Sequence, residues 1–160
     1  MFLSDRLPAE YWLPPFLAAI TTSSLAILIW RRRLSSTAAT LGTYLFSVAL
    51  WSFGYCLQVR GQSLAQQVFW SKVEYLGPAG VSLCGLIFVL QYCGFEGWVR
   101  RSRILMLAII PKVTQILVWT NEQHGLIWRR TWLDLSGPVP LLGRVHGPWF
   151  WLFLVYGYGL

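Results

Sequence analysis

Two opposite charges, Glu74 and Lys112, each lie in or beside a long apolar run of this sequence. If those runs cross a bilayer, a charge inside one costs about 2.5 to 3.5 kcal/mol on insertion scales, and such residues are often functional. A carboxylate and an ammonium at similar depth could lower that cost by pairing. Two alternatives remain open from the sequence: the side chains pair within a helix bundle, or each points separately to headgroups or water.

Polar and aromatic residues accompany both charges along the chain. Tyr75 follows Glu74, and the string WTNEQH, residues 119–124, ends the apolar run that holds Lys112. Asn121 could cap the end of a helix. His124 could titrate near neutral pH or simply be a surface histidine. The candidate ligand-binding residues, expected around the mouth of an outward-facing cavity, are Glu74, Tyr75, Lys112, Trp119, Asn121 and His124.

Residue patterns that would indicate catalysis or metal binding are missing from the sequence. His124 and His146 do not have metal-ligand spacing, and Cys56, Cys84 and Cys93 form no CxxC pair. The cysteines are better explained as packing residues within apolar runs. HExxH, GxSxG and paired aspartates within spans are also missing. We therefore predict no catalytic residue, no metal and no cofactor, and an intramembrane enzyme is the least favoured class.

The composition is typical of a membrane protein. Of 160 residues 56% are hydrophobic and 12% are charged, about half of the roughly 25% charged residues found in soluble domains. Runs without any charge are long enough to cross the hydrocarbon core as helices, which needs about 20 residues. These runs are 11–30, 34–59 and 75–95.

The predicted fold class is all-α, a multi-pass transmembrane helix bundle with four full spans and a partial fifth. Residues 148–160 cover only about 20 Å at 1.5 Å per residue, so the chain is expected to be a fragment. Pro78 predicts a local helix break that frees a carbonyl. Residues 121–147 are expected to form an outer interfacial structure, such as a short hairpin over the helices. The expected spans are 11–30, 36–57, 68–94, 104–120 and 148–160.

The net charge of +7 is concentrated after the first and third spans. These two loops lie on the same side of the predicted bundle, and the positive-inside rule places them in the cytoplasm with the N-terminus outside. Such clusters determine topology, and we expect no nucleic-acid binding. The basic residues concerned are Arg31, Arg32, Arg33, Arg100, Arg101 and Arg103.

Tryptophans concentrate near the expected outer surface. They favour an aromatic belt at the membrane interface, with the walls of an apolar-ligand pocket as the alternative. The residues are Trp119, Trp128, Trp132, Trp149 and Trp151.

Four strings together resemble the histidine kinase N-terminal 7TM region. The resemblance implies a seven-helix sensory module with its N-terminus outside, in the cytoplasmic membrane of bacterial or archaeal cells. Such modules precede signalling domains such as histidine kinases or diguanylate cyclases. Spans six and seven and any output domain are not represented, and no ligand is implied. The strings are LWSFGYCLQV, FWSKVEYLGPAGVSLCGLIFVLQYCG, IIPKVTQILVWTNEQHGLIW and GPWFWLFLVYGYGL.

The leading functional prediction is a membrane-embedded sensory module without chemistry of its own. Its expected partners are the lipid bilayer, an unknown small or lipid-soluble signal in the outer half of the bundle, and C-terminal signalling domains or a second copy of the chain. The alternative is a fragment of a transporter or channel with Glu74 and Lys112 on the path. Against it, the ionisable groups gather in the outer half, and none continue inward.

Overall fold

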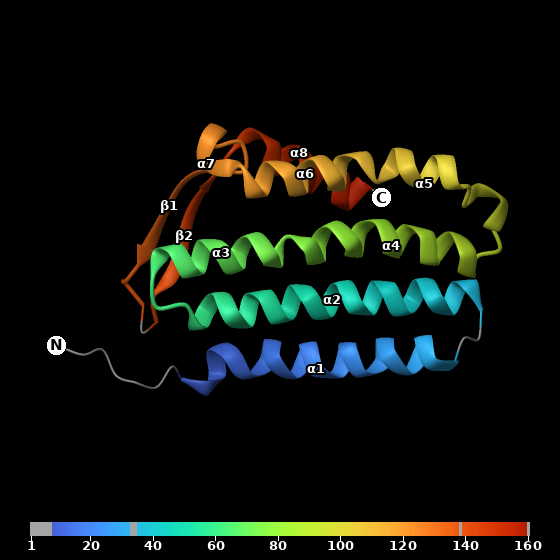
Figure 1. Ribbon diagram of the computed structural model, residues 1–160, viewed down its shortest axis with the longest axis horizontal. Helices are drawn as coiled ribbons and strands as arrows, with labels where there is room; N and C mark the ends of the chain where they lie inside the picture. The colour runs from blue at the N-terminus through green and yellow to red at the C-terminus, as the bar shows by residue number, and fades with distance from the viewer. Residues whose placement is uncertain (1–7, 33–34, 138, 160) are drawn as a thin grey trace.

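The computed structural model describes residues 8–32, 35–137 and 139–159, and it is mostly helical. Four long helical elements lie side by side in chain order, and a shorter helix packs behind the last of them (Figure 1). One two-stranded sheet is present, so the predicted all-α class is wrong in that single element. The helices are α1 (Ala9–Arg32), α2 (Ser36–Arg60), α3 (Leu64–Glu74), α4 (Leu76–Tyr92), α5 (Arg101–Leu107), α6 (Ile109–Trp119), α7 (Asn121–His124) and α8 (Pro148–Gly159).

Four of these elements are long and apolar enough to cross a membrane. They are α1, α2, the α3–α4 pair taken together and the α5–α6 pair taken together. The prediction of four full spans is therefore confirmed. In the structure the first helix begins two residues earlier than expected, and the second ends three residues later.

The third and fourth spans are each interrupted near a proline. Helix α3 passes into α4 at Tyr75, and the carbonyl of Tyr75 accepts a hydrogen bond from Gln115 Nε2 at 2.7 Å. Pro111 has no N–H to donate to the carbonyl of Leu107, four residues earlier. That carbonyl instead accepts a hydrogen bond from the hydroxyl of Tyr156 on α8, at 2.6 Å. The breaks thus create polar contacts between neighbouring helices.

Glycines allow α2 to approach α3 and α4 closely. A Cβ added at Gly54 would lie 2.8 Å from Cα of Glu74, and one added at Gly77 would collide with the backbone of Trp51. Small residues at helix interfaces permit such close packing in membranes. As a result, side chains of α2 reach the break between α3 and α4.

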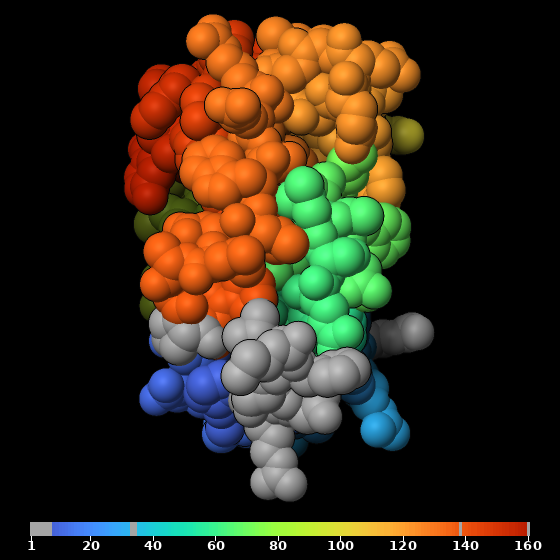
Figure 2. Space-filling view, turned by 90° about the vertical axis from the view of Figure 1, so that its left-hand side faces the viewer, coloured from blue at the N-terminus to red at the C-terminus, as the bar shows by residue number. Residues whose placement is uncertain are grey.

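A β-hairpin follows α7 and covers one end of the bundle. Strands β1 (Trp128–Asp134) and β2 (Leu141–His146) pair antiparallel, with an irregularity between Trp128 and Arg130. Seen end-on, the hairpin lies beside the first turns of α3 (Figure 2). Gln67 of α3 is fully buried there and donates to the carbonyls of Gly61 and Pro140. The segment expected to form an interfacial structure is therefore an ordered cover, which we call the hairpin end.

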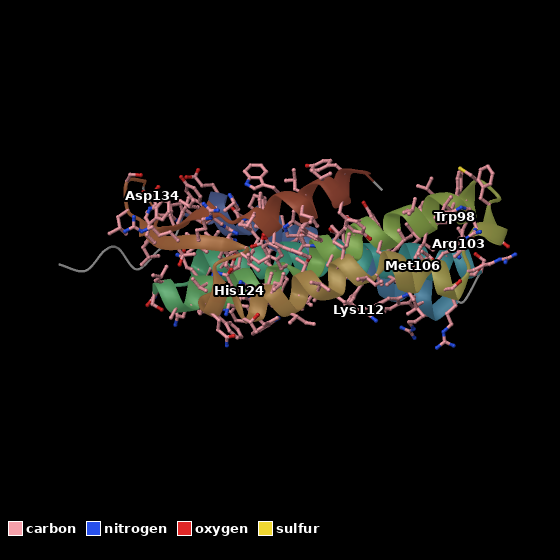
Figure 3. All side chains as sticks on the ribbon, turned by 90° about the horizontal axis from the view of Figure 1, so that it is seen from above. Trp98, Arg103, Met106, Lys112, His124 and Asp134 are labelled. Carbon is pink, nitrogen blue, oxygen red and sulfur yellow. The ribbon has the colours of Figure 1, made fainter. Side chains whose placement is uncertain are left out.

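The opposite end of the bundle carries the clustered arginines. All of those described are exposed, and Arg103 lies at the far end from Asp134 of the hairpin (Figure 3). The last turn of α1, the first turn of α2 and the connection from α4 to α5 lie at this end (Figure 1). Arg33 lies outside the described residues. We call this the arginine end; it comprises Arg31, Arg32, Arg100, Arg101 and Arg103.

Candidate functional site

A cavity of about 410 Å³ lies among α2, the α3–α4 break, α8 and the hairpin. Its walls are mostly apolar and include Pro78, Val81, Phe150, Phe153 and Leu154. Its polar lining comes from four different elements. These residues are Trp51 of α2, Glu74 of α3, Ser82 of α4 and Arg144 of β2.

Glu74 and Arg144 are oppositely charged, yet they are joined through an amide and not by a direct ion pair. Trp51 Nε1 donates to Glu74 Oε1 at 3.1 Å. In the orientation that satisfies both neighbours, the amide of Gln58 donates to Glu74 Oε2 at 2.6 Å and accepts from Arg144 Nη2 at 3.3 Å. Arg144 Nη1 also donates to Ser71 Oγ at 3.1 Å. We call these five residues the bridged cluster.

The position of each group follows from its local structure. Trp51, Gly54 and Gln58 recur at helical spacing, so they share the face of α2 that packs against Glu74. Arg144 pairs with Thr131 across the hairpin, and paired residues of antiparallel strands point to the same side. Arg144 therefore lies on the face of the hairpin that packs against the helix bundle.

The predicted pair between Glu74 and Lys112 is not formed. Lys112 is exposed and points away from the bundle (Figure 3). The buried face of α6 consists of Pro111, Thr114 and Val118, and at 100° per residue Lys112 falls outside it. Of the two alternatives, the structure contradicts the pair. Lys112 faces outward, where a lysine can extend its ammonium towards headgroups.

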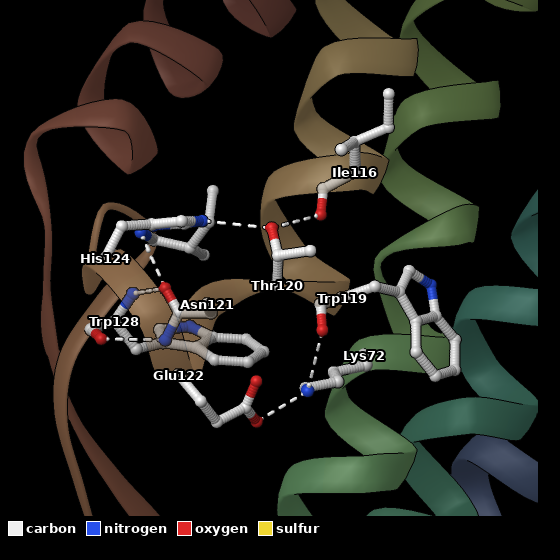
Figure 4. Close-up of polar contacts among 9 residues, drawn as sticks. Lys72, Ile116, Trp119, Thr120, Asn121, Glu122, His124 and Trp128 are labelled. Atoms are coloured by element: carbon white, nitrogen blue, oxygen red, sulfur yellow. Dashed lines mark hydrogen bonds and ion pairs between the residues drawn. The ribbon is translucent and has the colours of Figure 1, made fainter.

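A different lysine on α3 forms the ion pair. Lys72 Nζ contacts Glu122 Oε1 at 2.6 Å and donates to the carbonyl of Trp119 at 3.3 Å (Figure 4). It is the one ion pair within 4 Å among residues 8–32, 35–137 and 139–159. Desolvation is the largest single influence and opposes ionisation of Glu122, but the hydrogen bonds to its carboxylate and the positive charge of Lys72 together outweigh it and leave the pKa of Glu122 below its ordinary value. This contact connects α3 to the end of α6.

The side chain of Asn121 binds the backbone of the hairpin and does not cap the end of α6. The expectation that Asn121 caps a helix was therefore wrong. Its Oδ1 accepts from the backbone N–H of Ile127 at 2.9 Å and of Trp128 at 3.0 Å. Its Nδ2 donates to the carbonyl of Trp128 at 2.9 Å. Buried polar groups require such partners, and these three bonds fix the first strand of the hairpin against α7 (Figure 4).

His124 is exposed and belongs to the same turn. Its Nδ1 accepts from the N–H of Leu126 at 3.0 Å, so the proton of a neutral ring lies on Nε2. Nε2 lies 3.1 Å from Oγ1 of Thr120, whose hydroxyl donates to the carbonyl of Ile116. The ring therefore closes a local network beside α6.

Four of the six candidate residues line two separate cavities, and the other two line neither. Glu74 and Tyr75 line the apolar cavity. Asn121 and His124 line a separate polar hollow of about 340 Å³. Lys112 and Trp119 line neither of these two. The structure therefore brings together only part of the set.

The tryptophans also divide. Trp128 is buried in the core cluster, and Trp149 donates from Nε1 to Thr114 Oγ1 at 2.9 Å. Trp119, Trp132 and Trp151 are exposed, as an interfacial belt requires. None of the five lines the apolar cavity.

Sequence reasoning missed four members of the bridged cluster: Trp51, Gln58, Ser71 and Arg144. A signal was available for the two on α2, because a tryptophan, a glycine and a glutamine recur at helical spacing in one span. Arg144 had no such signal, since its place depends on the register of the hairpin.

Comparison with known proteins gives one result that covers nearly the whole chain. The model of the N-terminal 7TM region of histidine kinase matches residues 14–160. No curated protein and no solved structure matches the chain significantly. The match and the four candidate spans make the chain a membrane sensory module located in the cytoplasmic membrane. The chain covers only this input region, in which no catalytic domain is evident. The protein belongs to the family of N-terminal 7TM regions of histidine kinases.

Proposed function

We propose that this sensory module binds a small or lipid-soluble signal in the apolar cavity, with the hairpin end outside the cell. The observation that carries the proposal is the bridged cluster beside the cavity: Glu74 and Arg144 both line it, and within the part of the chain that the structure describes neither forms a direct ion pair. A mostly apolar pocket with a few convergent polar groups is the usual form of a small-molecule site.

The cavity walls suggest how binding reaches the rest of the molecule. One side of the cavity comes from α2 and α4 and the other from α8 and the hairpin. Helix α8 is attached to the α5–α6 span by two hydrogen bonds, Trp149 to Thr114 and Tyr156 to Leu107. A ligand that binds one arrangement of these two sides more tightly shifts the population towards it. The α5–α6 span then carries the change towards the arginine end.

Filling the cavity tests this proposal. Gly157 lines the cavity, and a Cβ added there would lie 3.1 Å from Ser82 Oγ. Gly159, on the same helix, has open space around it. In lipid nanodiscs, small amphiphiles are screened for those that raise the unfolding temperature of the wild-type chain. Gly157→Leu should abolish the effect of each hit, and the matched control Gly159→Leu should retain it. Hits that stabilise both variants equally would contradict the proposal.

The orientation is tested separately by accessibility labelling. Single cysteines at Ser136 and Arg101, in a background without the native cysteines, should be labelled from opposite sides of intact cells. Labelling of position 101 by an impermeant maleimide applied from outside would reverse the proposed layout.

The transporter alternative receives less support. Broken helices do occur at transporter sites, but both breaks here are bridged by hydrogen bonds from neighbouring helices. Among the described residues of α4, α5 and α6, charge occurs only at Arg101, Arg103 and Lys112, all of them exposed. A proteoliposome assay with the complete gene product should show no flux of protons or of any ligand that the chain binds.

A further inference from the structure

We infer that the ligand is a zwitterion with an apolar body: an anionic group and an ammonium close together, attached to a hydrocarbon part. This inference rests on the proposed function, because it names the ligand class of the same cavity. Arg144 would receive the anionic group, and Glu74 the ammonium.

Both charges of the bridged cluster are only partly satisfied by their hydrogen-bond partners. Glu74 accepts hydrogen bonds from an indole and an amide, and Arg144 donates to a hydroxyl and an amide oxygen. All of these partners are neutral. A carboxylate has about four acceptor positions and a guanidinium has five donors, so both groups keep capacity for a further partner. Both line the cavity, which is where that partner would bind.

The amide of Gln58 separates the two charges without removing either of them. Charges taken from water are normally compensated by direct pairing, as the buried ammonium of Lys72 is by the carboxylate of Glu122. Among residues 8–32, 35–137 and 139–159, no carboxylate lies within 4 Å of the Arg144 guanidinium and no cationic nitrogen lies within 4 Å of the Glu74 carboxylate. A ligand with two complementary charges would supply both missing counter-ions at once.

Other ligand classes fit the same lining less well. An anion would be attracted by Arg144 but repelled by Glu74. A cation would be attracted by Glu74 but repelled by Arg144. A wholly apolar molecule would displace water from both charges without replacing their hydrogen bonds, which is costly. A zwitterion is neutral overall, as the pair of lining charges is.

The remaining lining requires the ligand to carry an apolar part. Val81, Phe153 and Leu154 line the cavity together with the charged residues. Its volume of about 410 Å³ lies within the usual range for small-ligand pockets, about 300 to 1,000 Å³. Two sources share the required chemistry: a free amino acid with a large apolar side chain, and the phosphoethanolamine headgroup of a lipid with its chains.

The experiment compares probes that differ by one charge. The chain is placed in phosphatidylglycerol nanodiscs, which contain no zwitterionic lipid, and binding is measured by calorimetry. Phenylalanine is compared with 3-phenylpropionate, which lacks the ammonium, and with phenethylamine, which lacks the carboxylate. Lyso-phosphatidylethanolamine is compared with lyso-phosphatidylglycerol. We expect at least one zwitterion to bind about tenfold or more tightly than its singly charged relatives, since a charged hydrogen bond contributes that much.

Variants assign each charge to its partner. Glu74→Gln keeps an acceptor for Trp51 and should remove the preference for phenylalanine over 3-phenylpropionate. Arg144→Gln should remove the preference for phenylalanine over phenethylamine. The matched control Glu122→Gln neutralises a carboxylate outside the cavity and should leave both preferences unchanged.

Each result has a defined meaning. Binding of phenylalanine supports a free amino acid, and binding of lyso-phosphatidylethanolamine alone supports a lipid headgroup. If singly charged probes bind as tightly as zwitterions, or if no zwitterion binds, the inference is overturned. The proposed function would survive either result as long as some amphiphile stabilises the chain in a way that Gly157→Leu abolishes. If no amphiphile does so, both fail.

Discussion

Helix α3 carries two charged residues, one in a direct ion pair and the other joined to its opposite charge only through an amide. Lys72 contacts Glu122 directly at 2.6 Å and also reaches a backbone carbonyl. Glu74, two residues later, meets Arg144 only through Gln58. Both connect α3 to the segment after α6, but the first uses its charge for attachment and the second leaves its charge available beside a cavity. The difference explains why the proposed binding site includes Glu74 and not Lys72.

The largest effect should come from separating α2 from the bridged cluster. Gly54→Leu places a side chain against the backbone of Glu74, and such overpacking costs typically 1 to 3 kcal/mol or more. The variant should lose several degrees in unfolding temperature together with all ligand binding. Gly97→Leu, at a glycine with no atom within 4 Å of the added Cβ, is the control. A Gly54→Leu chain with wild-type unfolding temperature would show that α2 does not pack as described.

Removing the amide of Gln58 should allow Glu74 and Arg144 to form a direct ion pair. Gln58→Met leaves Glu74 and Arg144 without the intervening amide, at a cost of about 1 to 3 kcal/mol for the lost hydrogen bonds. We expect the two charges to move into direct contact and the affinity for zwitterions to fall. Double-mutant cycles in the Gln58→Met background should reveal coupling between Glu74 and Arg144. An unchanged affinity would exclude any role for the bridge.

Breaking the direct pair should affect stability without affecting binding. Glu122→Gln leaves the buried ammonium of Lys72 without its counter-ion, although the Trp119 carbonyl remains. Because the Glu122 side chain is 62% exposed, solvent screening limits the expected loss to about 1 kcal/mol. Chemical denaturation gives the stability, and calorimetry gives the affinity. A change in zwitterion preference would mean that the two charge systems are not independent.

The direct pair should also make the stability of the chain depend on pH. The pKa of Glu122 is lowered in the folded state. Its contribution is therefore complete above the ordinary glutamate pKa and is lost as the pH falls below that value through the lowered one. Unfolding temperature measured from pH 7 to pH 3 should fall less steeply in Glu122→Gln. Parallel curves for the two proteins would contradict the assignment.

The smallest effect concerns Lys112, which belongs to neither system. Lys112→Met should change the unfolding temperature by less than the Glu122 substitution, and its effect should add to that of Glu74→Gln within about 0.5 kcal/mol. A coupling energy above that limit would indicate that Glu74 and Lys112 do interact, contrary to the structure.

Sequence reasoning predicted those features that depend on neighbouring residues along the chain. The apolar runs gave the spans, and Pro78 gave the interruption after Glu74. Residues 121–147 were expected to form an outer interfacial structure such as a short hairpin, and two strands of this segment pair as a hairpin. The partners of Glu74 could not be predicted, because they depend on helix rotation. The rotation of α6 about its axis buries Pro111 in the bundle and leaves the next residue, Lys112, exposed on the bundle surface.

By itself the sequence determined that this chain crosses a membrane, about where it does so, and which family it belongs to. Those properties follow from local hydropathy and from strings of residues. Only the tertiary structure decided which charges meet. Arg144 lies 70 residues after Glu74 along the chain and reaches it through the register of a hairpin held by Asn121. Such contacts depend on how distant segments pack together, and no local pattern in the sequence encodes that packing.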